Sequence, residues 1–248
     1  MEGKKTFKDM HISPRLIKNL QAMGWTYPTE VQETVCPLAL AGRDLLVQSV
    51  TGSGKTGAFG VPIVDRLLLR GQYRSTSVVI LSPTRELAIQ TALVIQKMCT
   101  DAPISCALIV GGGQDFNSQA ELLRNEPDII IATPGRLIDH LLNSSVLMDN
   151  VEILVLDEAD KLLELGFQNE LEKILNYCPT KRQTMLFSAT MNTEVTQLAN
   201  LSLNKPLRVN VDPPRTINPN VQQQFVFTNG ELVDKLSILV HLLNNSFS

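Results

Sequence analysis

The chain has 248 residues, 44% of them hydrophobic and 19% charged, which suits one large globular domain, or one domain and part of another. Its formal net charge of −3 argues against binding nucleic acid through a basic stripe, so any such contact must come from a few positioned groups, such as helix N-termini and single arginines. No segment is apolar enough to cross a bilayer and the first residues lack the apolar core of a secretory signal, so we expect an intracellular protein without a membrane partner.

A short helical module is predicted in front of the first strand. Ser13 fits an N-cap position, and Pro14 fits the first turn of a helix. Leu16, Leu20 and Met23 follow at helical spacing and share one face. The module therefore begins at Pro14 and has one apolar side.

Short β-branched apolar runs then recur along the chain with helical stretches between them. This alternation predicts a parallel sheet, and runs that are apolar at nearly every position predict strands covered on both faces. We therefore predict an α/β fold in which a doubly wound parallel β-sheet has helices on both faces. The predicted strands are residues 45–47, 78–81, 107–110, 128–132, 153–156 and 184–187.

A glycine-rich loop follows the first predicted strand and precedes a helix predicted at residues 57–69. Small residues such as Gly52 and Gly54 let backbone N–H groups surround phosphate oxygens, Lys55 can reach the β and γ phosphates, and the Thr56 hydroxyl can hold Mg²⁺. The loop is nearly a Walker A sequence, with Ser49 where glycine is usual. The alternative is a glycine-rich turn without a ligand. The predicted nucleotide-binding residues are Ser49, Val50, Thr51, Gly52, Ser53, Gly54, Lys55 and Thr56.

An acidic turn follows the predicted strand at residues 153–156, as expected if a carboxylate at the end of a neighbouring strand fixes the metal. Asp157 would orient Mg²⁺ through water, together with Thr56, and Glu158 would polarise the water that attacks the γ phosphate. The alternative is a solvated acidic turn that caps the next helix. Its pairing with the phosphate loop favours the first interpretation, with Lys55, Asp157 and Glu158 as catalytic residues.

The same turn carries a family resemblance. Asp157-Glu158-Ala159-Asp160 spells the signature of the DEAD-box RNA helicases, and the chain from Phe7 to about Val211 resembles the first RecA-like domain of that family. The resemblance implies a RecA-like P-loop NTPase domain, ATP and Mg²⁺ as cofactors, RNA as partner and duplex unwinding as activity.

Residues 24–32 resemble the family's Q motif. In that motif a glutamine, here Gln32, reads the adenine edge, and an upstream aromatic residue, here Phe7, packs on the base. An amide can pair with both the N6 donor and the N7 acceptor of adenine, so the resemblance implies ATP rather than GTP. Without it, Gln32 would be interpreted as a surface helix residue.

Two further segments resemble motifs Ia and Ib, residues 83–88 and 133–136, with glycines 111–113 between them. Each of the two follows a predicted strand and opens a helix, so its N–H groups and its arginine would converge on an anion at one edge of the sheet. The alternative is plain helix capping by Thr84 and Thr133. The resemblance implies sequence-independent contacts to the RNA backbone from Pro83, Thr84, Arg85, Gly112, Thr133 and Arg136.

Ser188-Ala189-Thr190 matches the family's motif III, which links ATP hydrolysis to strand separation. The resemblance implies that Asp160, Ser188 and Thr190 couple the two events, with both hydroxyls able to hydrogen-bond Asp160. An ordinary strand-to-helix cap fits the residues equally well.

The C-terminal part is predicted to begin a second domain. A proline-rich polar stretch indicates a linker at residues 212–223, after a core domain at 1–211. Residues 224–227 are predicted as a strand and 235–243 as an amphipathic helix, which the resemblance assigns to the start of a truncated second RecA-like domain. The family's motifs IV to VI do not occur in these residues, so the chain alone is expected to bind ATP, hydrolyse it poorly and unwind negligibly.

Two classes of function fit these motifs. The leading hypothesis is an ATP-dependent RNA helicase, and the alternative is an ATP-gated RNA clamp that acts as a binding module in a ribonucleoprotein. A DNA translocase fits the Q motif less well. Residues 133–140 and the proline-rich linker resemble members that assist ribosome assembly, which implies ribonucleoprotein partners and a nuclear or nucleolar location, with the cytoplasm left open.

Overall fold

The computed structural model of the chain describes residues 5–70, 75–113, 115–211, 226–228 and 230–245. It divides into two compact units, Met1–Asp212 and Pro213–Ser248, which are treated separately below. Among the described residues no helix is both long and apolar enough to span a bilayer.

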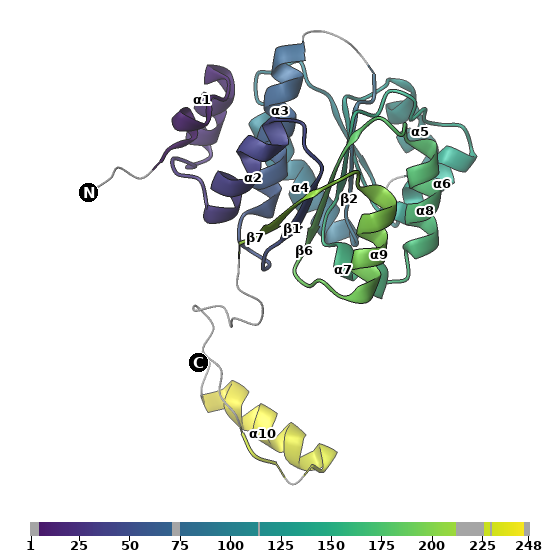
Figure 1. Cartoon of the computed structure of the whole chain (residues 1–248). Coiled ribbons are helices and arrows are strands. Elements are labelled where there is room, and N and C mark those ends of the chain that lie inside the picture. The colour runs from purple at the N-terminus through teal and green to yellow at the C-terminus, as the bar shows by residue number, and fades with distance from the viewer. Residues whose placement is uncertain (1–4, 71–74, 114, 212–225, 229, 246–248) are drawn as a thin grey trace. The chain divides into compact units, whose positions relative to one another are not determined.

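The first unit is built on one parallel sheet, which confirms the predicted α/β fold (Figure 1). In the described residues its seven strands have the order β3-β4-β2-β5-β6-β1-β7. Each predicted strand is present with its ends shifted by at most one residue, and a further strand, β7, completes the edge. The strands are β1 (Leu45–Gln48), β2 (Val78–Leu81), β3 (Cys106–Ile109), β4 (Ile129–Ala132), β5 (Ile153–Leu156), β6 (Gln183–Ser188) and β7 (Leu207–Asn210).

Helices cover both faces of this sheet, as the continuous apolar strands predict (Figure 1). The predicted N-terminal module is α1, with Pro14 in its first turn, and the predicted helix after the phosphate loop is α3, which begins earlier, at Lys55. One face carries η1 (Phe7–Met10), α1 (Pro14–Ala22), α2 (Glu30–Leu40), α3 (Lys55–Arg70) and α4 (Arg85–Met98). The other carries α5 (Phe116–Arg124), α6 (Pro134–Leu142), α7 (Ala159–Glu164), α8 (Gln168–Tyr177) and α9 (Thr193–Ser202).

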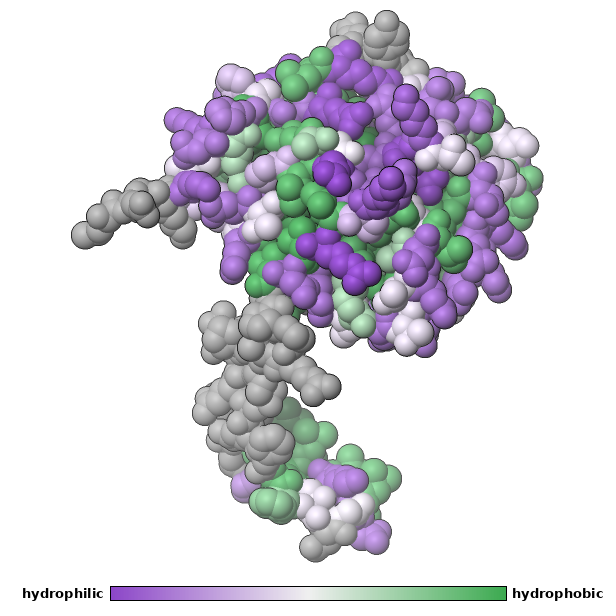
Figure 2. All heavy atoms as spheres, in the orientation of Figure 1, coloured by the Kyte–Doolittle hydropathy of each residue, from purple (hydrophilic) through white to green (hydrophobic). Residues whose placement is uncertain are grey.

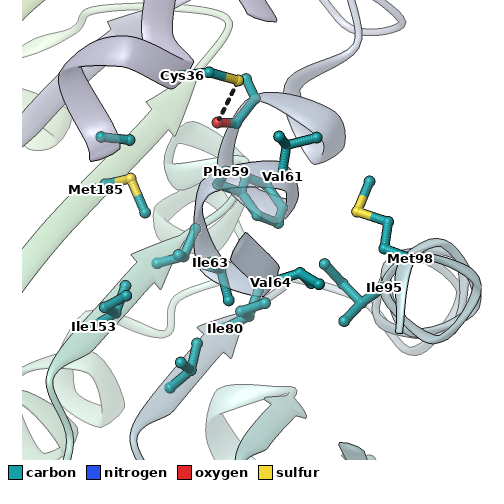
Figure 3. Close-up of a cluster of buried hydrophobic side chains, with 14 of the residues drawn as sticks. Cys36, Phe59, Val61, Ile63, Val64, Ile80, Ile95, Met98, Ile153 and Met185 are labelled. Atoms are coloured by element: carbon teal, nitrogen blue, oxygen red, sulfur yellow. Dashed lines mark hydrogen bonds between the residues drawn. The ribbon is translucent and has the colours of Figure 1, made fainter. Parts of the chain in front are cut away.

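The strands divide their side chains between two hydrophobic clusters, one under each helical layer. Along β2, Val78 and Ile80 point into the first cluster, and Val79 and Leu81 into the second. Figure 3 shows part of the first cluster, where Ile63 and Val64 of α3 lie close to Ile80 of the sheet. Burial of this much apolar surface stabilises the sheet and holds the ends of its strands in fixed positions.

The second unit contains α10 (Leu232–Asn245), which includes the predicted helix at 235–243. Of the predicted strand at 224–227, residues 224 and 225 lie outside the described residues, and Val226 and Phe227 form no strand, so that part of the prediction is wrong. Apolar side chains are exposed on α10, as Figure 2 shows, among them Leu232 at 70% and Leu236 at 52%. In a folded domain, apolar side chains along one helix normally pack against another element.

Candidate functional site

The predicted motifs that follow strands all lie at one edge of the sheet. The strands are parallel, so their carboxyl ends open on the same edge, where α/β proteins bind ligands. The phosphate loop leaves β1, and the acidic turn leaves β5. The prediction that these two strands are neighbours is wrong, because β6 lies between them and pairs with both. The coupling segment at the end of β6 therefore lies between the two halves of the nucleotide site.

The phosphate loop closes around its own lysine. Lys55 is buried, and its Nζ donates to the carbonyl oxygens of Ser49 at 2.9 Å and Val50 at 3.3 Å. Gly52 and Gly54 have φ values of +83° and +100°, which favour glycine. The Ser49 hydroxyl donates to that of Ser53 at 2.7 Å, so serine at the first position adds a contact within the loop that glycine could not make.

The loop is exposed at its tip and half-buried toward the helix. Thr51 and Gly52 are exposed, whereas Ser53, Gly54 and Thr56 are half-buried. Lys55 Nζ donates here to carbonyl oxygens, and a phosphate oxygen could replace these acceptors.

Gln32 is buried against the phosphate loop. Its Oε1 accepts from the Thr29 backbone N–H at 3.0 Å, and its Nε2 donates to the Gly54 carbonyl at 3.0 Å. The interpretation of Gln32 as a surface residue is therefore wrong, since it is 3% exposed. Each amide atom has capacity for one more hydrogen bond, so adenine recognition by Gln32 stays a prediction that fits this geometry.

Phe7 lies in the first hydrophobic cluster and is only 2% exposed. Together with Trp25 and Thr26 it lines a small pocket of about 120 Å³. Its predicted packing on the base stays a prediction, and it would use the little ring surface that the core leaves accessible.

The acidic turn places two buried carboxylates beside the phosphate loop. Burial raises the pKa of Asp157 to about 7, although the charge of Lys55 opposes this shift. Burial also lowers the pKa of Lys55, and Asp157, Glu158 and Asp160 oppose that change. Asp157 Oδ1 is buried without a hydrogen-bond partner among the described residues. A buried carboxylate oxygen that the protein leaves unpaired fits a magnesium ligand, directly or through water.

Glu158 stands at the start of α7 in the left-handed region, with φ 51° and ψ 55°. Its Oε2 lies 2.6 Å from Lys161 Nζ, one turn along the helix. A non-glycine residue in this conformation is uncommon, and such strain tends to occur at functional sites. The sequence motif indicated the carboxylate but neither its backbone conformation nor its partner.

The expected hydrogen bond to Asp160 forms for the Thr190 hydroxyl and not for the Ser188 hydroxyl, and the coupling role of these residues stays a prediction. Asp160 Oδ2 accepts from the backbone N–H and the Oγ1 of Thr190, both at 3.0 Å. Ser188 Oγ instead donates to the Thr190 carbonyl at 2.7 Å, because Ser188 is the last residue of β6 and its hydroxyl lies under the turn. The acidic turn and the end of β6 are thereby tied together through Thr190.

The segment after β2 exposes an arginine at the same edge. Arg85 is exposed and Nη1 donates to the carbonyl of Gly112, in the loop after β3. Thr84 accepts from the Leu87 N–H at 3.3 Å, so the capping alternative holds for this residue. Pro83 is buried, and its predicted RNA contact stays a prediction.

The segment after β4 behaves differently. Within the described residues Thr133 makes no side-chain cap hydrogen bond, so capping does not explain this threonine. Arg136 is half-buried, and its Nε donates to Gln119 Oε1 at 2.8 Å. Sequence reasoning missed Gln119, which belongs to no recognised motif, although glutamine on a helix close after the glycines 111–113 was a weak signal.

Comparison with known proteins supports the family that the motifs indicate. A model of the DEAD/DEAH box helicase family matches residues 29–198. The probable ATP-dependent RNA helicase ddx27 of Dictyostelium discoideum is 48% identical over 98% of this chain and 31% of its own length. The ATP-dependent RNA helicase DRS1 of Kluyveromyces lactis is 48% identical over 90% of this chain and 30% of its own length.

A solved structure shows the same fold. The DEAD box protein from Methanococcus jannaschii has a TM-score of 0.79 and 33% identity over 97% of this chain and 63% of its own length. The chain spans only about a third of the two helicases, so the comparisons bear on this domain and not on their whole length. Because the family model covers more than half of the chain and its sheet carries the motifs at one edge, the chain belongs to the DEAD/DEAH box helicase family.

Proposed function

We propose that residues 1–211 form the ATP-binding and RNA-backbone-binding half of an ATP-dependent RNA helicase. The observation that carries the proposal is the buried Asp157, with one oxygen unpaired, within electrostatic reach of Lys55. Burying two charges lowers the stability of the folded chain. Such a pair is typical of a functional site, where binding of a metal–nucleotide complex would stabilise the charges.

In this proposal the phosphate loop N–H groups and Lys55 bind the β and γ phosphates, and Gln32 and Phe7 select adenine. Thr56 and Asp157 hold Mg²⁺, which when bound neutralises charge on the phosphates. Glu158 orients the attacking water and accepts its proton. Lys161 holds the Glu158 carboxylate 2.6 Å away and so limits where that water can be placed.

RNA would lie across the ends of β2, β3 and β4. Its phosphates would be bound by helix N-termini and by Arg85 and Arg136, which requires no basic surface and agrees with the net charge of −3. Thr190, bonded to Asp160, would transmit the state of the nucleotide site toward the RNA.

The remaining residues would supply the connection to a second RecA-like domain, with 212–223 as linker and 224–248 as its start. That domain would add the arginines that complete the ATP site. Ribonucleoprotein or ribosome-assembly partners, and an intracellular, nuclear or nucleolar location, are part of the same proposal and are supported by resemblance alone.

Glu158→Gln in the full-length protein tests the enzymatic role. We expect ATP binding to persist and RNA-stimulated hydrolysis to fall on the order of 100-fold or more, because the amide cannot accept the proton of the water. Glu164→Gln, an exposed change on the same helix, is the matched control and should leave turnover unchanged.

The two classes of function differ in this experiment. Absence of RNA stimulation in the unmodified protein would contradict the proposal. Strand separation that tracks hydrolysis supports the helicase, whereas ATP-dependent retention of RNA by Glu158→Gln, with no strand separation by the unmodified protein, identifies the clamp.

A further inference from the structure

A buried polar cluster lies between α5 and α6, below the loop that follows β3. Gln119 on α5 and His140 on α6 are both 0% exposed. Polar side chains are rarely buried this completely unless their hydrogen bonds are satisfied. The bonds of Gln119 therefore show what the cluster holds in place.

Gln119 makes bonds in three directions. Its Nε2 donates to the Val110 carbonyl at 2.8 Å, and its Oε1 accepts from Arg136 Nε at 2.8 Å. His140 Nε2 lies 3.1 Å from the same Oε1. The amide orientation follows from chemistry, because the Val110 carbonyl can only accept and the arginine can only donate. Gln119 thus connects the end of β3 to the arginine after β4.

The orientation of the Gln119 amide also determines which ring nitrogen of His140 carries the proton. Since Gln119 Oε1 is an acceptor, His140 Nε2 must carry the hydrogen. Its Nδ1 is buried and has no hydrogen-bond partner in the described part of the chain. Burial and the nearby charge of Arg136 lower the pKa of His140, so the ring remains neutral beside the guanidinium.

Phe116 completes the support of the arginine. Its ring stacks on that of His140 with centroids 4.1 Å apart and an interplanar angle of 9°. Arg136 Cζ lies 5.0 Å from the Phe116 ring centroid, within the range of a cation–π contact. Arg136 is therefore held at Nε by an amide and at its plane by a ring.

The cluster also reaches the second arginine through the loop after β3. Val110, which Gln119 holds, immediately precedes glycines 111–113. Arg85 donates to Gly112, and a Cβ added at Gly113 would lie 2.5 Å from Arg85 Nη2. One loop thus contacts Arg85 directly and is tied to Arg136 through Gln119.

We propose that Gln119 is a positioning residue for RNA binding: it fixes Arg136 and ties it to the glycine loop that Arg85 contacts, so that the two arginines meet successive phosphates at a set spacing. This inference rests on the RNA-binding role proposed above. Its physical advantage is that a preordered guanidinium loses less side-chain freedom when it binds a phosphate.

A double-mutant cycle on the full-length protein tests the proposal. The variants are Gln119→Leu, Arg136→Ala and the pair, and Gln96→Leu on α4, the same change at an exposed helical position, is the control. The measurements are affinity for a labelled single-stranded RNA with an ATP analogue, affinity for the ATP analogue alone, and thermal unfolding.

We expect Gln119→Leu to weaken RNA binding on the order of tenfold and to have less than a twofold effect once Arg136 is alanine. Affinity for the ATP analogue should not change. If the leucine variant unfolds in the assay range, Gln119→Met, which matches glutamine in length, enters the same cycle.

Losses that multiply in the double variant, an unchanged RNA affinity in Gln119→Leu, or a parallel loss of ATP-analogue affinity would overturn the positioning role. If Arg136→Ala itself leaves RNA affinity unchanged, the RNA site of the proposed function fails, and the role of Gln119 falls with it. The two failures are therefore distinguishable.

Discussion

At the scale of single residues, the candidate site keeps charges where an apolar core would be more stable. Asp157 and Lys55 are both buried. Burial raises the pKa of Asp157 and lowers the pKa of Lys55, and each shift favours the neutral form of the group. The pKa of Asp157 stays raised although Lys55 opposes the shift, so the ionised carboxylate disfavours folding. We therefore expect this region to be less stable without its ligand than its packing alone would make it.

Asp157→Asn should stabilise the chain in the presence of EDTA at neutral pH. Since burial raises the pKa of Asp157 from 3.8 to about 7, the folded state holds a proton that the unfolded state releases. The contribution of this group to stability is then complete below pH 4 and is lost as pH rises through 7. Over that pH range the free energy of unfolding of the asparagine variant should rise relative to that of the wild type, by on the order of a few kcal/mol at pH 8.

Thermal unfolding between pH 5 and 8, with Asp149→Asn as an exposed control, measures this difference. The same variant should lose magnesium-dependent ATP binding. A wild type that is more stable than Asp157→Asn at pH 8 would show that Asp157 is not a strained charge in the folded protein.

Gly57→Ala tests the close packing of the Q motif against the phosphate loop. A Cβ at Gly57 would lie 2.3 Å from Gln32 Nε2 and 2.8 Å from Trp25 Cζ3. We expect destabilisation of about 1 to 3 kcal/mol, measured by urea unfolding, and weaker ATP binding because Gln32 must move away from Gly54. Gly111→Ala, whose Cβ meets no described atom within 4 Å, should change stability by less than about 0.5 kcal/mol.

At the scale of elements, the helices that begin at the functional edge differ in how their first turns are satisfied. Asp115 caps α5 and Asn192 caps α9, each through a side chain that accepts backbone N–H groups. Thr84 caps α4 in the same way. For Thr133, ahead of α6, the described residues show no such bond. A helix N-terminus with fewer internal acceptors has more N–H groups to offer an anion.

Thr84→Ala and Thr133→Ala form a matched pair at two equivalent strand ends. We expect Thr84→Ala to lower the free energy of unfolding by about 1 kcal/mol, because it loses the cap, and Thr133→Ala to lower it by less. RNA affinity of the full-length protein should fall more in Thr133→Ala. Equal losses of stability in the two variants would mean that Thr133 has a structural role that its hydrogen bonds do not show.

At the scale of the whole molecule, the sheet unit is complete within its own residues. β7 ends at Asn210, and the Val211 N–H donates to the Gln48 carbonyl at 3.2 Å, which extends the pairing of β7 with β1 by one residue. The boundary between the two compact units follows immediately, between Asp212 and Pro213. Stability and nucleotide binding should therefore both belong to the first unit.

Ending the chain after Asp212 should leave the thermal unfolding midpoint and the affinity for ATP unchanged. The physical reason is that α10 belongs to the second compact unit and leaves its own apolar residues exposed. Calorimetry of the two lengths, with binding of a fluorescent ATP analogue, checks this. A lower midpoint for the shorter chain would mean that residues after 212 stabilise the sheet unit.

The sequence by itself determined the strands of the sheet and indicated the candidate nucleotide site. Apolar runs indicate buried parallel strands, because strands covered on both faces are apolar at nearly every position, and the six strands predicted between residues 45 and 187 are present. Phosphate and metal binding depend on short contiguous motifs, so local spacing is enough to predict Lys55, Asp157 and Glu158 as site residues. Recognition of Gln32 and Thr190 needed the family resemblance.

Only the tertiary structure decided how distant segments meet. Strand order is set by how helices pack on the two faces, so β6 came between β1 and β5, and Ser188 bonded Thr190 in place of Asp160. The bond from Arg136 to Gln119 joins residues 17 positions apart on two helices. Gln119 lies on α5, a helix that the sequence analysis did not assign. Its burial, and with it the proposed role, arises from contacts that no local pattern encodes, because they form only when the helices pack together.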